Sequence, residues 1–185
     1  MVLMSSPSSY QKFKIIDFKL RSTEDVYISL DTVSGENGTI IMFICNHCPY
    51  VKAVIGEVVK ITKKIKKLGF GIVAIMPNDT SSYSEDSFEN MRIFSKQNFF
   101  NFPYLIDDDQ MVSKKYGAVC TPDFFCFNKD GFLQYRGRIF EIRNLVPVNL
   151  NHNELLNAIM LIANSGCGPK IQFPSIGCSI KWKKN

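Results

Sequence analysis

The sequence predicts an α/β sandwich around a central mixed β-sheet, because strand-like and helical segments alternate along it. Residues 39–44 and 71–76 are apolar runs rich in β-branched side chains, which is typical of buried central strands. The segment between them repeats apolar residues at helical spacing, and this strand–helix–strand order implies a right-handed parallel crossover. Residues 124–127 and 132–135 flank an Asn-Lys-Asp-Gly turn that favours a β-hairpin, and residues 153–164 have the pattern of a closing helix.

The remaining segments complete this arrangement. The first long helix should end before Gly69, with its lysines on the face opposite the apolar residues. Shorter elements are expected as strands at residues 13–20, 25–30 and 104–106 and as helices at residues 87–98 and 112–116. We therefore expect a flexible N-terminus over residues 1–12, one domain with an N-terminal β extension over residues 13–165, and a C-terminal tail over residues 166–185 that packs on the domain.

Composition narrows the class of protein. The chain has 185 residues, 45% of them hydrophobic and 21% charged, which suits one soluble globular domain. No apolar run approaches the length of a membrane span and the Ser-rich N-terminus does not resemble a secretory signal, so we expect a cytoplasmic protein with no membrane partner. The net charge of +5 comes largely from lysines of the first helix and the tail. These lysines are not interleaved with aromatic residues, so nucleic acid is not an expected partner.

The most informative motif is Cys45-Asn46-His47-Cys48, at the junction between a strand and the helix that begins at Pro49. The chain has six cysteines, which are too few and too unevenly spaced for a disulfide-stapled scaffold. A Cys-x-x-Cys pair in a reducing compartment is more typical of redox chemistry or of metal binding. Unpaired backbone N–H groups at a helix start also stabilise a thiolate and lower the pKa of a nearby thiol.

This placement predicts a catalytic dithiol. Cys45 is the expected nucleophile, with the more exposed sulfur, and Cys48 is the expected resolving thiol, one helical turn further in. After Cys45 attacks a target disulfide, Cys48 would attack the mixed disulfide and release the reduced target. His47 and Asn46, between the two cysteines, are candidates for tuning the pKa of the Cys45 thiol, although His47 fits an exposed polar residue without effect equally well.

Three stretches of the chain carry a resemblance to a known family. They are residues 45–51 (CNHCPYV), 120–125 (CTPDFF) and 177–183 (GCSIKWK). With the dithiol that follows a buried strand, they resemble a subgroup of the redoxin branch of thioredoxin-fold proteins, the alkyl hydroperoxide reductase/thiol-specific antioxidant superfamily. The resemblance implies a three-layer thioredoxin-like sandwich and thiol-based redox activity. It also implies a cis bond before Pro122, which would pack against the dithiol, and a Thr121 backbone that binds an extended substrate peptide.

Two further cysteines are candidate auxiliary thiols. Cys120 should lie near the dithiol, as a third redox partner, a metal ligand or simply a small, partly buried side chain. Cys178 belongs to the third stretch and could reach back as a resolving thiol, whereas packing of Ile180 and Trp182 against the body is the simpler role of that stretch. Cys126 falls in a strand and is expected to be inert.

The sequence departs from its relatives at positions that bear on activity. In the peroxide-binding motif Pro-x-x-x-Thr-x-x-Cys of peroxiredoxins, the Pro and Thr positions are occupied here by Gly38 and Met42, which argues against peroxidase activity. The buried aspartate of thioredoxin corresponds here to Thr39. Proton transfer to Cys48 therefore needs another group or a water molecule.

Three functions remain open on these residues. The leading hypothesis is an oxidoreductase that acts on protein or small-molecule disulfides, is recycled by a thiol reductant or reductase, and uses no cofactor and no metal. The second is a peroxide-reducing variant in which Cys45 forms a sulfenic acid that Cys48 resolves. The third is a carrier of copper(I) or zinc held by Cys45, Cys48, His47 and Cys120, although a closed site needs four ligands and the local spacing offers three.

Overall fold

A seven-stranded mixed sheet forms the centre of the computed structural model, which describes residues 2–6 and 13–184. Its spatial order is β3 (Tyr27–Ser29), β2 (Lys19–Ser22), β6 (Tyr104–Ile106), β5 (Phe70–Met76), β4 (Gly38–Phe43), β8 (Asp123–Asn128) and β9 (Leu133–Gly137). The pairs β4–β5 and β5–β6 are parallel, and the other neighbours are antiparallel. The carboxyl ends of β4 and β5 therefore meet at one edge of the sheet.

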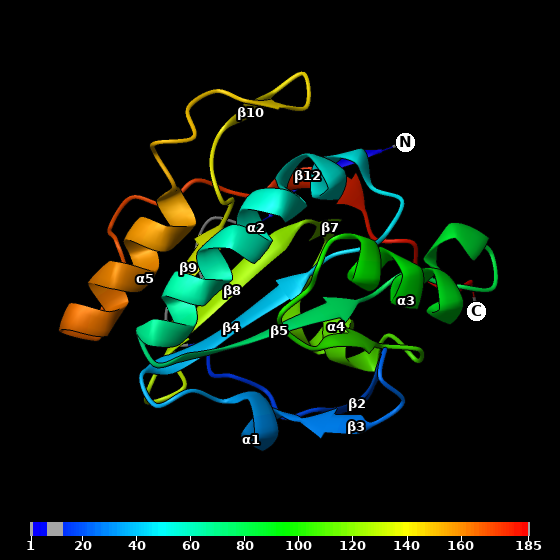
Figure 1. Ribbon diagram of the computed structural model, residues 1–185, viewed down its shortest axis with the longest axis horizontal. Coiled ribbons are helices and arrows are strands. Elements are labelled where there is room, and N and C mark those ends of the chain that lie inside the picture. The colour runs from blue at the N-terminus through cyan, green and yellow to red at the C-terminus, as the bar shows by residue number, and fades with distance from the viewer. Residues whose placement is uncertain (1, 7–12, 185) are drawn as a thin grey trace.

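Helices cover both faces of this sheet, which gives the predicted three-layer sandwich (Figure 1). On one face lie α2 (Pro49–Lys67), α3 (Phe88–Gln97) and α5 (Glu154–Ser165), and on the other lie α1 (Leu30–Val33) and α4 (Met111–Tyr116). The sheet has a hydrophobic core on each face, and successive residues of β4 point alternately into one core and the other. Ile40 and Met42 pack under α2, whereas Ile41 and Phe43 pack toward α4.

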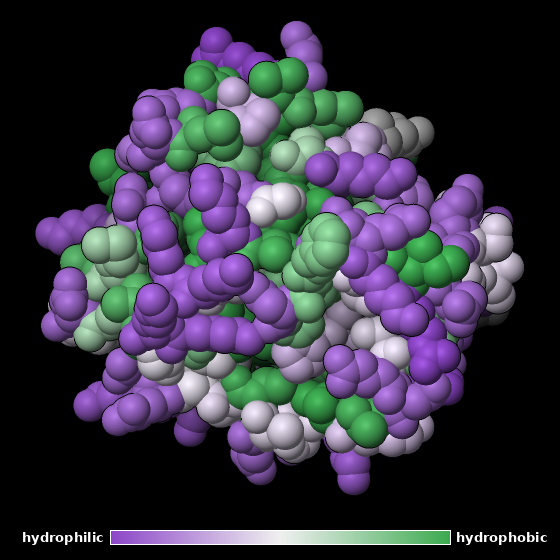
Figure 2. All heavy atoms as spheres, viewed as in Figure 1, coloured by the Kyte–Doolittle hydropathy of each residue, from purple (hydrophilic) through white to green (hydrophobic). Residues whose placement is uncertain are grey.

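The long helix α2 follows from its sequence. Pro49 occupies its first turn, where a missing N–H costs nothing, and Gly69 follows its end with a φ of 76°. Its apolar stripe is buried against the sheet, and hydrophilic side chains dominate the surface where α2 lies (Figure 2). No helix among the described residues is long and apolar enough to cross a membrane.

A second, three-stranded sheet brings the C-terminal tail to the end of the main sheet. It consists of β1 (Leu3–Ser5), β12 (Ile176–Ser179) and β7 (Cys120–Thr121), with β12 in the middle and antiparallel to both neighbours. In Figure 1, β12 lies beside the N-terminal end of α2 and β7. A short hairpin, β10 (Ile142–Arg143) with β11 (Val146–Pro147), and a single turn, η1 (Ser84–Asp86), complete the described elements.

The structure differs from the sequence predictions at the start of the first strand and in several short elements. The strand expected over residues 13–20 begins only at Lys19, because earlier backbone groups bind elsewhere: the Ile15 N–H donates to the Gly131 carbonyl and the Ile16 N–H to the Tyr116 hydroxyl. The one-turn helix α1 and the strand β12 were not anticipated, since each depends on contacts with distant segments. Within the N-terminus predicted to be flexible over residues 1–12, Leu3–Ser5 form the strand β1, because they pair with β12, and residues 1 and 7–12 lie outside the described residues.

Candidate active site

The two cysteines of the motif lie in the loop from β4 to α2. Cys48 is the residue that precedes the first turn of α2, not a residue one turn inside it, and Cys45 lies three residues earlier. Both side chains are 0% exposed, so the expectation that Cys45 would be the more exposed thiol is wrong. The strands β7 and β12, which are distant in sequence, supply the atoms that touch the two sulfurs.

Thr121 and Cys178 form the immediate surroundings of the dithiol. The Cys45 Sγ lies 3.2 Å from the Thr121 Oγ1, and the Cys48 Sγ lies 3.1 Å from the Thr121 carbonyl oxygen. The Cys48 Sγ also lies 2.9 Å from the Cys178 Sγ. The fold thus brings the side chains of Cys45, Cys48 and Cys178 together beside Thr121.

The shared hydrogen bond between the two thiols of the motif separates their pKa values. The hydrogen bond with Cys45, assisted by Cys178 and the Val51 backbone N–H, outweighs burial and lowers the pKa of Cys48 to about 5. The bond with Cys48, then burial and the charge of Asp86, raises the pKa of Cys45 well above its ordinary value. The thiolate is therefore held on Cys48, beside the N-terminus of α2, while Cys45 keeps its proton.

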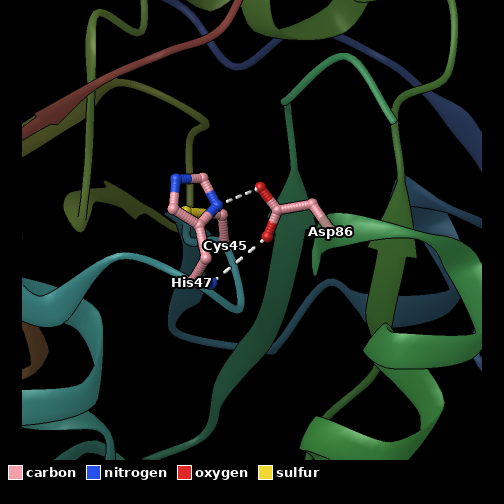
Figure 3. Close-up of side chains that lie close together, drawn as sticks. All are labelled: Cys45, His47 and Asp86. Carbon is pink, nitrogen blue, oxygen red and sulfur yellow. Dashed lines mark hydrogen bonds and ion pairs between the residues drawn. The ribbon is translucent and has the colours of Figure 1, made fainter. Parts of the chain in front are cut away.

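His47 is paired with a carboxylate that the sequence analysis did not identify. The His47 Nδ1 lies 2.6 Å from the Asp86 Oδ2, and the His47 backbone N–H donates to the Asp86 Oδ1 (Figure 3). The Asn46 backbone N–H donates to the same oxygen at 2.8 Å. The hydrogen bond with Asp86 outweighs burial and raises the pKa of His47. Burial alone would raise the pKa of Asp86, but hydrogen bonds from His47 and Asn78 overcome it and lower this pKa. The pairing accordingly favours the imidazolium form of His47 and the carboxylate form of Asp86.

Two more polar residues fix this loop. The Asn78 Nδ2 donates to the Asp86 Oδ2 at 2.7 Å, and the Tyr104 hydroxyl donates to the Asn46 Oδ1 at 2.9 Å. Asp86 and Asn78 both follow β5, whose carboxyl end lies next to that of β4. The polar loop after the second parallel strand was the available signal for them, because such loops meet at one edge of the sheet.

The described residues offer one group of ligand atoms for a metal. The Cys45 sulfur, a His47 ring nitrogen and an Asp86 oxygen lie within 4.8 Å of one another. Cys48 and Cys120, which the sequence analysis also considered as ligands, are not in this group. The Cys120 Sγ lies 4.0 Å from the Ser175 carbonyl oxygen. Burial raises the pKa of the Cys120 thiol, and that of Cys126 in β8, well above the ordinary value.

The second sequence signal, the Thr121–Pro122 bond, is cis as the resemblance implied. Pro122 lines a cavity of about 230 Å³ whose walls are partly apolar, from Phe124 and Ile139, and partly polar, from Arg138 and Ser175. The backbone of Thr121 is already opposite Cys178 in the β7–β12 pair. An extended peptide could therefore bind Thr121 only if β12 moved.

Two solved structures resemble this one over essentially the whole chain. An uncharacterised conserved protein from Geobacillus kaustophilus is 38% identical, with a TM-score of 0.92 and coverage of 100% of this chain and 98% of that one. A hypothetical protein from Sinorhizobium meliloti 1021 is 30% identical, with a TM-score of 0.90 and coverage of 98% and 99%. Among curated proteins, no match was found.

A more distant structure identifies the fold. The thioredoxin domain of a thiol-disulfide oxidoreductase from Bacteroides vulgatus has a TM-score of 0.59 at 15% identity, with coverage of 74% of this chain and 91% of that domain. The sandwich is thus thioredoxin-like, as predicted. The model of the AhpC/TSA family matches residues 12–136, a span that includes the dithiol, Asp86 and the cis-proline. This chain belongs to the AhpC/TSA family.

Proposed function

We propose that this protein is a thiol–disulfide oxidoreductase that works through a Cys45–Cys48 dithiol/disulfide couple. Membership of the AhpC/TSA family supports a thiol-based redox enzyme in general. The observation that carries the specific proposal is that both thiols of the motif lie buried at the start of α2 and both contact Thr121. Their interaction lowers the pKa of Cys48 and raises that of Cys45. Such a pair holds one thiolate and one proton ready for exchange at neutral pH.

The proposed reaction begins with attack by Cys45. Its sulfur forms a bond to one sulfur of the substrate disulfide, its proton passes to the Cys48 thiolate, and the other substrate sulfur leaves as a thiolate. Cys48 then gives that proton to the leaving thiolate and, again as a thiolate, attacks the Cys45 sulfur of the mixed disulfide. The bond between Cys45 and the substrate breaks, and the second substrate sulfur leaves as a thiolate that takes up a proton from solvent. The substrate gains two electrons, and the enzyme is left with a Cys45–Cys48 disulfide.

In this proposal His47 and Asp86 take the place of the buried aspartate that the chain lacks at Thr39. His47 is the partly exposed member of the site, and its side chain is 26% accessible whereas that of Asp86 is fully buried. An imidazolium within 4.8 Å of the Cys45 sulfur stabilises a developing Cys45 thiolate and can supply a proton to the departing sulfur. Asp86 acts as a positioning residue, because it fixes the ring and keeps it protonated.

We propose protein or small-molecule disulfides as substrates and a thiol donor as the reductant. Both sulfurs are covered, so any substrate requires an opening of the site. The cavity beside Pro122, with both apolar and polar residues in its walls, offers room for a side chain that flanks the target disulfide. A strand-like protein substrate would additionally have to displace β12 from Thr121.

The direct test is reduction of a protein disulfide, such as those of insulin, with dithiothreitol as electron donor. Cys45→Ser and Cys48→Ser should each lose at least about a hundredfold in rate, because each removes one sulfur of the couple. Cys167→Ser is the matched control, since Cys167 is exposed and distant from the motif in sequence, and it should keep the wild-type rate. Full activity in Cys45→Ser would refute the proposal. Hydrogen peroxide in place of insulin tests the peroxidase alternative in the same assay.

A second candidate function, metal binding, is favoured by the cluster of Cys45, His47 and Asp86. These sulfur, nitrogen and oxygen ligands would suit zinc. Protein purified without chelator should then contain about one metal ion per chain by elemental analysis, and Asp86→Asn should reduce that content. Metal-free protein that reduces insulin would eliminate this candidate in favour of the oxidoreductase.

A further inference from the structure

The tail strand β12 places a third thiol, that of Cys178, in contact with the dithiol. Cys178 lies opposite Thr121 in the β7–β12 pair, and its Sγ is 2.9 Å from the Cys48 Sγ. A disulfide bond is about 2.05 Å long, so the two sulfurs are within an ångström of bonding distance. β12 is bonded on both sides, to β1 and to β7, and Cys178 is 2% exposed. The contact is thus part of the packed fold.

Further backbone and side-chain bonds hold the tail at this place. The Lys181 N–H donates to the Asn78 Oδ1 at 2.9 Å, and the Lys181 carbonyl oxygen accepts from the Asp79 N–H at 2.8 Å. Asn78 in turn binds Asp86, the partner of His47. The tail therefore closes over both the sulfur atoms and the charged pair of the site.

We infer that Cys178 is a third redox thiol, which takes over the disulfide from Cys45 by exchange at Cys48. The inference rests on the proposed function, which leaves a Cys45–Cys48 disulfide after each turnover. The Cys178 sulfur attacks the Cys48 sulfur, the bond from Cys48 to Cys45 breaks, and the proton of Cys178 ends on Cys45. One disulfide is exchanged for another with no net oxidation, and Cys45 is again a thiol.

The charges around Cys178 are consistent with this order of events. Burial, the hydrogen bond with Cys48 and the negative charge of Cys48 together raise the pKa of Cys178 to about 12 while the dithiol is reduced. Once Cys48 is part of a disulfide, its charge is gone, and Cys178 ionises more readily. The nearby Lys181 favours the Cys178 thiolate in either state.

After the exchange, the disulfide joins Cys48 to Cys178 and no longer includes Cys45. The new bond joins β12 to the start of α2, and a thiol reductant can restore the enzyme by attack on either of its sulfurs. The Cys45 thiol, next to His47, is meanwhile available for another substrate. Neither Cys120 nor Cys167 shares the contact that Cys178 makes with Cys48. The Cys120 Sγ has a polar contact with a carbonyl oxygen, and Cys167 is exposed.

Trypsin separates the two disulfides by sequence. Cys45 and Cys48 share the tryptic peptide of residues 22–52, whereas Cys178 lies in the peptide of residues 171–181. Cys45→Ser protein oxidised with diamide, alkylated and digested without reductant should yield these two peptides joined, with a mass two hydrogens below their sum. Cys178→Ser should instead yield the peptide of residues 22–52 with an internal disulfide. Cys167→Ser is the control and should give the wild-type products.

The outcomes separate this inference from the proposed function. If folded Cys45→Ser forms no intramolecular disulfide while Cys178→Ser still closes one within residues 22–52, the third-thiol inference is refuted and the couple stands. If Cys178→Ser closes none, the proposed couple itself fails. The second measurement uses wild-type protein equilibrated in a series of glutathione buffers of increasing redox potential and then digested in the same way. The digest should contain the joined peptides, and their absence throughout the titration would overturn the inference even if Cys45→Ser did not fold.

Discussion

The chemistry of this site depends on the particular residue at the start of α2. A cysteine in the position that precedes the first turn receives the Val51 N–H and a hydrogen bond from Cys45, so Cys48 carries the negative charge. The motif itself predicted the dithiol, but not which sulfur would be ionised. That outcome depends on Cys178, Thr121 and Asp86, none of which lies within the motif.

At the residue scale, Asp86→Asn tests the positioning role of the carboxylate. Loss of the anionic partner should lower the pKa of His47, so that less imidazolium is present at neutral pH. We expect kcat/KM for disulfide reduction to fall about tenfold near pH 7, equivalent to about 1.4 kcal/mol, and the loss to shrink at lower pH. An NMR titration of the His47 ring together with the pH profile of the rate provides the measurement. An unchanged His47 pKa would contradict this role.

At the scale of elements, β12 determines how the dithiol is covered. Gly177 lacks a Cβ and so allows the close approach of β12 to β7. A Cβ at this position would lie 2.0 Å from the Thr121 carbonyl oxygen. The strand is four residues long and was not predictable from its own sequence, since its partners are Leu3–Ser5 and Cys120–Thr121. Its placement explains why both thiols are buried.

Gly177→Ala should therefore loosen β12 without altering any side chain of the site. We expect a loss of about 1–3 kcal/mol in stability and faster alkylation of Cys48 and Cys178 in the native, reduced protein. Gly56→Ala is the matched control, because Gly56 lies in α2 with no atom within 4 Å of the added Cβ. That change should raise stability by about 0.5–1 kcal/mol and leave alkylation unchanged. Equal alkylation rates in both variants would show that β12 does not protect the sulfurs.

At the scale of the whole molecule, the sandwich could be predicted from the order of elements, because its central strands and long helices have clear local sequence patterns. The helix α2, the parallel pair β4–β5 and the hairpin β8–β9 all have periodic apolar patterns and clear end signals. What could not be predicted are the elements whose stability comes from distant partners, notably β12. The Asp86–His47 pair belongs to the same class, because 39 residues separate its members.

The whole-molecule consequence of the Cys48 thiolate is a pH-dependent stability. The pKa of Cys48 is about 5 in the folded state and about 8.5 in an unfolded chain, so ionisation favours the folded, reduced protein. This stabilisation is fully present above the unfolded pKa and is lost as the pH falls toward 5. Urea denaturation of reduced wild type and Cys48→Ser should show a stability difference that grows from pH 5 to about pH 8. A difference that is independent of pH would contradict a Cys48 thiolate.

The central claim is the Cys45–Cys48 couple, and a redox titration of Cys178→Ser tests it most directly, because this variant removes the competing sulfur. Protein equilibrated in glutathione buffers of known potential is alkylated and its disulfide is located by mass. We predict one reversible two-electron transition, whose disulfide lies within the peptide of residues 22–52. The transition should be absent from the double variant that also carries Cys45→Ser. A dithiol that shows no reversible transition in folded protein would contradict the proposed function.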